Sequence, residues 1–253
     1  MARVVFLGTA SAVAYAGHQN THLVVEGDEH IILIDCVGNP VLRLQQIGIH
    51  FNNLTDLMIT HFHPDHVSGL PLLLMNMWLL GRERPLCVYG SPHSMSRIEK
   101  MMNLFDWEEW PDMFPVVFHR LPMNEMTQAL KSDDIQIFTS PVEHLIPTLG
   151  LRIEFTTKDF VIGYSCDTDP CPQTVDLASE GDILIHEAAG ALDGHSSPAE
   201  AGEIAQKAGV NKLYLIHYSL YEQDVQTMLE EARKTFSGDV VLAEDFMEIA
   251  VPD

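Results

Sequence analysis

Residues 60–66 read THFHPDH and place three histidines and one aspartate within six positions, directly after the apolar run of residues 57–59. Imidazole nitrogens and carboxylate oxygens are the ligands that suit zinc and similar divalent ions. His61 and His63 are two residues apart, so on an extended segment they point to the same side. Asp65 and His66 follow as the chain turns into an apolar helix. One compact loop is therefore predicted to serve two metal ions, and a polar surface turn explains the cluster poorly.

The rest of the chain alternates short apolar runs with helical patterns. This alternation predicts a layered α/β fold. A length of 253 residues with 46% hydrophobic residues suits a single domain over 1–253. Strands are expected at 4–7, 21–26, 30–35, 57–60, 86–89, 116–120, 135–139, 148–155, 160–165, 183–186, 212–217 and 246–251. Helices are expected at 40–47, 66–80, 94–104, 197–207 and 222–236, and hairpin loops at 26–29 and 156–159.

Net charge and cysteine content indicate which substrates and which cellular location suit the chain. The formal net charge is −22 and only 14 residues are lysine or arginine, so a long polyanion is repelled and a small anionic substrate is favoured. Cys36, Cys87, Cys166 and Cys171 form no C-x-x-C pair. No export signal and no run of about 20 apolar residues is present, so we expect reduced thiols, a cytoplasmic location and no membrane partner.

The His-x-His-x-Asp-His pattern after a strand resembles the metallo-β-lactamase superfamily, and the likeness continues in order along the chain. Further matching stretches are FLGTAS at 6–11, IDC at 34–36, HLIPTLG at 144–150, SCDT at 165–168 and LIHYS at 215–219. Within the superfamily the chain most resembles ribonuclease Z and the related phosphodiesterases. The resemblance implies a four-layer αββα sandwich and a metal-dependent hydrolase. Cys36 and Cys166 stand where this branch usually has glycine, which puts the geometry of both turns in question.

The resemblance also implies a set of metal ligands. His144, Asp167 and His217 each lie at or just beyond an expected strand end, where sites of layered α/β folds gather. Two divalent ions are implied, zinc first, with manganese or iron as alternatives. The implied ligands are His61, His63 and His144 for one ion, Asp65, His66 and His217 for the other, and Asp167 as a bridge.

Two further stretches indicate which branch of the superfamily the chain resembles. IHEAA at 185–189 and GHSS at 194–197 resemble the His-Glu-Ala-Thr and His-Ser-Thr loops of ribonuclease Z, with Ala189 in place of threonine. The resemblance implies that Glu187 orients His195, which then protonates the leaving oxygen. The alternatives are a solvated strand-end carboxylate and a histidine that only precedes a helix capped by Ser196 or Ser197.

The implied reaction is attack on a phosphodiester by a metal-bridging hydroxide, with Asp65 positioning the nucleophile. Ribonuclease Z enzymes with a transfer-RNA-binding arm carry it between the third-motif histidine and the bridging aspartate. Only 23 positions separate His144 from Asp167, and two expected strands fill them. A small or cyclic nucleotide-like diester is therefore the expected substrate, and transfer RNA is disfavoured as a partner.

Several alternatives stay open. They are a transfer-RNA 3′-processing endonuclease, a lactone, lactam or thioester hydrolase of the same fold, and a non-catalytic metal-binding sensor. Relatives are often dimers, so a homodimer is an open alternative. The stretch 105–115 is either an irregular packed loop or a lid or wall beside the site. Six histidines match no ligand position, although the first two and His93 could face the pocket: His18, His22, His30, His50, His93 and His119.

Overall fold

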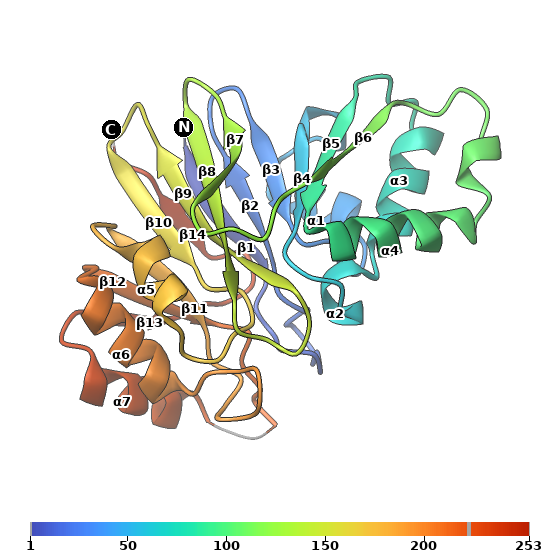
Figure 1. The fold of residues 1–253 in the computed structure, drawn as a ribbon. Helices are drawn as coiled ribbons and strands as arrows, with labels where there is room; N and C mark the ends of the chain where they lie inside the picture. Colours follow the sequence, from blue (N-terminus) through green and yellow to red (C-terminus); the bar gives the residue numbers. More distant parts are fainter. Residues whose placement is uncertain (1, 222–223, 253) are drawn as a thin grey trace.

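Two seven-stranded sheets face each other in the computed structural model, which describes residues 2–221 and 224–252 (Figure 1). The first sheet has the order β14-β1-β2-β3-β4-β5-β6 and the second β13-β12-β11-β10-β9-β8-β7. The first sheet comprises β1 Arg3–Gly8, β2 His22–Glu26, β3 Ile31–Ile34, β4 Asp56–Ile59, β5 Leu86–Gly90, β6 Val116–Arg120 and β14 Glu248–Ala250. The second comprises β7 Thr127–Lys131, β8 Ile135–Val142, β9 Thr148–Phe155, β10 Phe160–Tyr164, β11 Ile183–Glu187, β12 Lys212–Ile216 and β13 Asp239–Leu242.

Helices cover the outer face of each sheet. The first sheet carries α1 Pro40–Gln46, α2 Pro64–Val67, α3 Leu70–Leu79 and α4 Pro92–Asn103, with short 3₁₀ turns at η1 Phe51–Asn53 and η2 Trp107–Glu109. The second carries α5 Pro172–Ala178, α6 Pro198–Ala208 and α7 Val225–Thr235. The expected four-layer αββα sandwich is confirmed (Figure 1). Among the described residues, no helix has the length and apolar character needed to cross a membrane.

The central strands are apolar on both faces because both faces are covered. In β1, Val4 and Phe6 point into the core between the sheets, whereas Val5 and Leu7 pack against the helices. All four side chains are fully buried. Burial of each such side chain stabilises the fold by about 1.5–3 kcal/mol relative to exposure.

Strand direction brings the site residues to one edge. β4 runs parallel to its neighbours β3 and β5, and β10, β11 and β12 run parallel to one another. β8 and β10 are both antiparallel to β9, so β8 also ends at the edge where β10 ends. The segments that carry predicted ligands therefore leave each sheet from the carboxyl ends of its strands.

Three elements were absent from the sequence prediction, namely β7, β13 and α5. β7 and β13 are the two edge strands of the second sheet; the TQALK sequence of β7 is mostly polar, and the DVVL run of β13 was overlooked. α5 begins at Pro172, and its seven residues are too few for a clear helical period. The expected strand 246–251 is shorter, because Phe246 adopts a positive φ of 68° and does not continue the strand.

The helix expected at 66–80 is wrong in its start and its continuity. The chain instead forms α2 from Pro64, breaks at Gly69, and continues as α3. A side chain at Gly69 would lie 2.7 Å from the backbone of Val37. Glycine at the break therefore allows the two backbone segments to pack closely. Pro71 lacks the N–H that a continuous helix would need. The helix expected at 222–236 begins at Val225, and residues 222 and 223 lie outside the described part of the chain.

Candidate metal centre

One cluster of imidazoles joins the first sheet to the second. His61 and His63 follow β4, and His144 follows β8. Nε2 of His61 lies 3.1 Å from Nδ1 of His63, and Nε2 of His144 lies 3.2 Å from that same Nδ1 atom. The three nitrogens thus converge within 4.8 Å of one another, a spacing that fits a shared cation.

A second cluster combines Asp65, His66, Asp167 and His217, again with ligand atoms within 4.8 Å of one another. Oδ2 of Asp167 lies 3.3 Å from Nε2 of both His66 and His217. Oδ2 of Asp65 lies 3.5 Å from Nε2 of His66 and 4.0 Å from Nε2 of His217. The carboxylate of Asp167 also lies 3.7 Å from Nε2 of His61, so it stands between the two clusters.

Unpartnered buried atoms test whether a cation fits this cradle. Nε2 of His66 and Oδ1 of Asp167 are buried and have no hydrogen-bond partner. Leaving such polar atoms unpaired costs about 1–3 kcal/mol each, and a bound cation removes that cost. Burial disfavours a charged His66, but Asp167 and Asp35 outweigh it and hold the pKa of His66 well above its usual value. Burial lowers the pKa values of the other four imidazoles, which favours their neutral form, and neutral imidazoles beside carboxylates suit divalent metal binding.

The outward nitrogens of four predicted ligand imidazoles also have hydrogen-bond partners. In metal sites such partners fix the tautomer and orientation of the ring. The pairs are His61 Nδ1 with Thr60 Oγ1 at 3.1 Å, His66 Nδ1 with Asp35 Oδ2 at 2.8 Å, His144 Nδ1 with the Gly194 carbonyl at 2.6 Å, and His217 Nδ1 with Thr21 Oγ1 at 3.1 Å.

Asp35 is the site residue that sequence reasoning missed. It is fully buried at the end of β3, adopts a φ of 60°, and accepts hydrogen bonds from the backbone and hydroxyl of Thr60 as well as from His66. Its position in the IDC stretch was the available signal, but nothing in the sequence alone paired it with a histidine 31 residues later.

Glu187 and His195 form a close pair beside the clusters. Nδ1 of His195 lies 2.8 Å from Oε1 of Glu187, which also accepts the backbone N–H groups of Thr168 and Ser196. Burial raises the pKa of Glu187 to about 7. Burial opposes protonation of His195, but the hydrogen bond and charge of Glu187 raise the pKa of His195 above its ordinary value. Glu187 is fully buried, not a solvated strand-end group.

Ala189 and Cys166 replace residues that are usual in the family, and the local structure is retained at both positions. Ala189 lacks the family's hydroxyl, but its backbone N–H still donates to Oε2 of Glu187. Cys166 adopts the left-handed conformation at φ 55°, which glycine adopts without strain. Its thiol fits into the core 3.6 Å from Nδ1 of His61. Ser197, and not Ser196, caps α6.

The stretch 105–115 packs on α3 and also forms the wall of a cavity. The ring of Trp110 stacks on Trp78 at 5.0 Å, and Nε1 of Trp78 donates to the carbonyl of Pro111 at 2.7 Å. A cavity of about 280 Å³ is lined by Ser68, Pro71, Leu72, Met75, Phe105 and Trp110. Ser68 also lines a neighbouring cavity of about 370 Å³ together with the candidate ligand Asp65, so the two cavities adjoin.

The six unassigned histidines belong to none of the ligand clusters found among the described residues. His22 is fully buried, and its Nδ1 lies 2.8 Å from the carbonyl of Asn20. His18 pairs through Nδ1 with the hydroxyl of Thr9 at 3.1 Å. Burial, Arg97 and His63 lower the pKa of His93.

Fold and site together define a metal-dependent hydrolase of the metallo-β-lactamase superfamily, in its ribonuclease Z-like and phosphodiesterase branch. Residues 2–238 match the family model described as Anti-Pycsar protein Apyc1, and the chain belongs to this family. The resemblance inferred from the sequence is thereby confirmed.

Relatives and solved structures agree with this assignment. Ribonuclease Z of Methanothermobacter thermautotrophicus is 28% identical over 307 residues, which cover 99% of this chain and 97% of that protein. Ribonuclease Z of Mycobacterium sp. (strain KMS) is 30% identical, covering 86% and 84%. The structure of the metallo-β-lactamase fold protein YhfI from Bacillus subtilis superposes with a TM-score of 0.83 at 20% identity, covering 98% of both chains. Human tRNase Z, short form, gives 0.80 at 25% identity, covering 99% and 100%.

Proposed function

We propose that this metal-dependent phosphodiester hydrolase acts on a small substrate, with a cyclic or otherwise short nucleotide-like diester as the preferred class. The observation that carries the proposal is the Glu187–His195 pair beside a ligand cradle whose connecting segment has no room for an RNA-binding arm. The pair supports diester cleavage, because an imidazole held by a carboxylate can protonate the alkoxide that leaves phosphorus.

In this proposal the cradle would hold two divalent cations, with zinc as the first candidate. His61, His63 and His144 would hold one, Asp65, His66 and His217 would hold the other, and Asp167 stands between the two sets. Such cations neutralise phosphate charge and lower the pKa of water, so that a nucleophile is available near neutral pH. Asp65 reaches the second cluster from the first sheet, where its carboxylate can also hold the attacking water.

His195 supplies the proton for the departing oxygen. Because Nδ1 of His195 pairs with the Glu187 carboxylate, Nε2 is the nitrogen that faces the substrate side. The hydrogen bond and charge of Glu187 raise the pKa of His195 against the effect of burial, which favours the protonated imidazole that an acid needs. The ring lies 5.0 Å from that of His144 and 5.8 Å from that of His217, so the proton is close to any phosphate bound at the cradle.

Substrate size is inferred from the chain between the ligands. β9, β10 and their hairpin fill the interval from His144 to Asp167. The match to the Methanothermobacter ribonuclease Z extends over 307 positions, against 253 residues here, so at least 54 positions of that alignment have no residue in this chain. Together with a net charge of −22, this favours a small anion over folded RNA.

The adjoining cavities suit a substrate with one anionic and one flat apolar part. The phosphate would bind at the cradle, and the apolar part would enter the cavity walled by Phe105 and Trp110. At about 280 Å³ this cavity is near the lower end of the range for small-molecule sites, and too small for a helical nucleic acid.

A substrate panel tests the proposal. Protein loaded with zinc, manganese or iron is assayed on cyclic nucleotides, linear dinucleotides, a nitrophenyl diester, a lactone series and precursor transfer RNA, with Asp65→Ala as the inactive control. We expect the highest kcat/KM for a small diester. Cleavage of precursor transfer RNA alone would favour the second candidate, a ribonuclease Z activity, which the names of the relatives support. Turnover of lactones without any diester would overturn both.

A further inference from the structure

Asp169 ties together the two loops that carry His144 and His195. Its backbone N–H donates to the carbonyl of Glu143 at 2.7 Å, and its Oδ2 accepts the backbone N–H of Gly194 at 2.9 Å. Asp169 is two residues beyond Asp167 but belongs to neither metal-ligand cluster. Its contacts are with backbone groups next to the site residues, so its influence on the site is indirect.

Gly194 also forms a hydrogen bond to a predicted metal ligand. Its carbonyl accepts Nδ1 of His144 at 2.6 Å. Gly194 has a φ of 80°, and a side chain there would lie 2.8 Å from the same Nδ1 atom, so only glycine fits. The chain of contacts therefore runs from the Asp169 carboxylate through Gly194 to the His144 ring.

Ser196, which follows His195 in the chain, is held by a hydrogen bond of its own. Oγ of Ser196 donates to the carbonyl of Thr168 at 2.7 Å. Residues 168 and 169 thus fasten residues 196 and 194, one on each side of the acid. Between Gly190 and Gly194 the loop is exposed at Ala191, Leu192 and Asp193. Other hydrogen bonds also hold the loop, from the N–H of Gly190 to the carbonyl of Ser196 and from the N–H of Ser196 to Oε1 of Glu187. The Asp169 contact is the one that fixes the N–H of Gly194.

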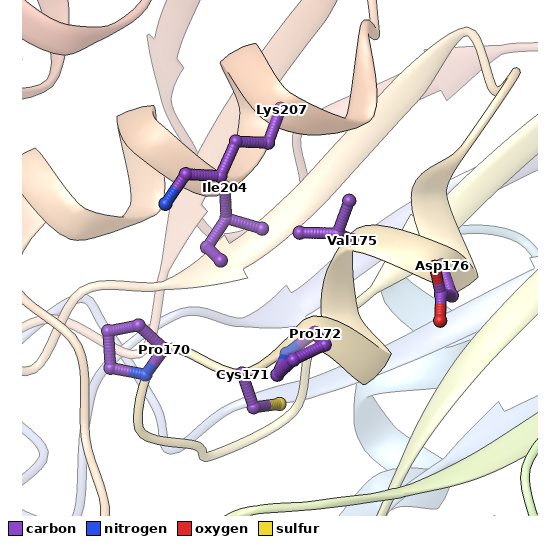
Figure 2. Close-up of a pocket in the computed structure, with 7 residues that line it drawn as sticks. All are labelled: Pro170, Cys171, Pro172, Val175, Asp176, Ile204 and Lys207. Atoms are coloured by element: carbon purple, nitrogen blue, oxygen red, sulfur yellow. The ribbon is translucent and has the colours of Figure 1, made fainter.

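Asp169 itself is firmly anchored. The chain continues through Pro170, Cys171 and Pro172, which line a cavity of about 310 Å³ between α5 and α6, and Figure 2 shows Ile204 and Lys207 on the facing helix. Sγ of Cys171 lies 3.2 Å from Oγ1 of Thr174, in the first turn of α5. Pro170 and Pro172 restrict the backbone next to Asp169, which limits the movement of its carboxylate.

We propose that Asp169 is a positioning residue for the reaction, which fixes Gly194 so that the neighbouring His195 imidazole keeps its working orientation. This inference rests on the acid role of His195 in the proposed function. The part it adds is that the carboxylate acts as a hydrogen-bond acceptor for one backbone N–H. A purely electrostatic role, an extra negative charge near the cations, predicts different behaviour of an amide replacement.

Three variants separate these roles. Asp169→Ala removes the acceptor, Asp169→Asn keeps an acceptor oxygen without the charge, and Asp176→Ala is the matched control, an exposed aspartate on α5 that lines the cavity of Figure 2. We expect Asp169→Ala to bind metal and to lose about 10–100-fold in kcat on an alkyl diester but less than about 3-fold on a nitrophenyl diester, with little change in KM. Asp169→Asn should stay within about 3-fold of the parent on both.

Hydrogen exchange provides a readout that does not need activity. The amide of Gly194 should lose protection in Asp169→Ala and retain it in Asp169→Asn and Asp176→Ala. Unchanged exchange in Asp169→Ala would overturn the inference, and so would equal loss on both diesters or an asparagine variant as impaired as alanine. If the parent hydrolyses no diester while Asp169→Ala still loses protection, the proposed function fails and the contact survives.

Discussion

The two sheets supply the site in different ways. The first contributes His61, His63, Asp65 and His66 from one six-residue segment after β4. The second contributes single residues from separate strand ends: His144 after β8, Asp167 after β10, Glu187 in β11 and His217 after β12. Ligands on one short segment hold their spacing by local backbone geometry. Predicted ligands on separate strands depend on the register of a whole sheet. Packing changes far from the site can therefore displace the site residues of the second sheet.

Asp167→Ala should have the largest effect, because its carboxylate lies between the two predicted ligand clusters. We expect loss of both cations and a fall in kcat/KM of about 10³-fold or more, since each 1.36 kcal/mol of lost transition-state stabilisation is tenfold in rate. Metal analysis and steady-state kinetics check this. Full metal content in this variant would show that the two halves bind independently.

His195→Ala should have the next largest effect and should separate acid catalysis from metal binding. The second sheet presents His195 through Glu187. We expect the variant to keep its metal and to lose about 10²–10⁴-fold on an alkyl diester, with far less loss on a nitrophenyl diester, whose leaving group needs little protonation. Equal losses on the two substrates would remove His195 from the acid role.

Asp35→Asn and Thr21→Val compare how each sheet supports a ligand. The first sheet holds His66 with a buried carboxylate, and His217 of the second sheet has a neutral hydroxyl partner. We expect Asp35→Asn to weaken metal binding about 10–100-fold, as is typical for loss of a partner behind a ligand, and Thr21→Val to weaken it less. Competition with a chelator measures both affinities. Equal effects would mean that the charge of Asp35 adds nothing.

His186→Gln should have the smallest effect on activity and a visible effect on stability. His186 precedes Glu187 in β11, is fully buried, and its pKa is lowered by burial to about 4. Because the unfolded chain binds a proton near pH 6.5 and the folded chain near pH 4, stability is lost as pH falls through this window, by up to about 3 kcal/mol. Urea unfolding of metal-free parent and variant at pH 5 and 7 should show a flatter dependence in His186→Gln. Identical slopes would contradict this.

The same contrast decides what could be predicted from the sequence. The segment after β4 could be recognised on its own, because three histidines and an aspartate in six positions suit a metal site and are of little use for packing. His144, Asp167 and His217 were predicted as ligands only through their order along the chain, since a single histidine at a strand end is usually a packing residue. Most strands were predicted from apolar runs, whereas the edge strand β7 has a mostly polar sequence.

Other features had no local signal. The break at Gly69 depends on the approach of Val37, a residue 32 positions earlier. The pairing of Asp35 with His66 and the contact of Asp169 with Gly194 arise only when separate loops meet in space. Such contacts are set by how the sheets pack against each other, and a pattern within one segment carries no record of them.

A crystal structure of the metal-loaded protein, with anomalous scattering recorded at the absorption edge of the bound metal, tests the central claim most directly. Two peaks are predicted, about 3.5–4 Å apart, one among the imidazoles of His61, His63 and His144 and one beside Asp65, His66 and His217, with the Asp167 carboxylate contacting both. A single peak, or two peaks that Asp167 does not contact, would contradict the claim that the two sheets build one dinuclear centre.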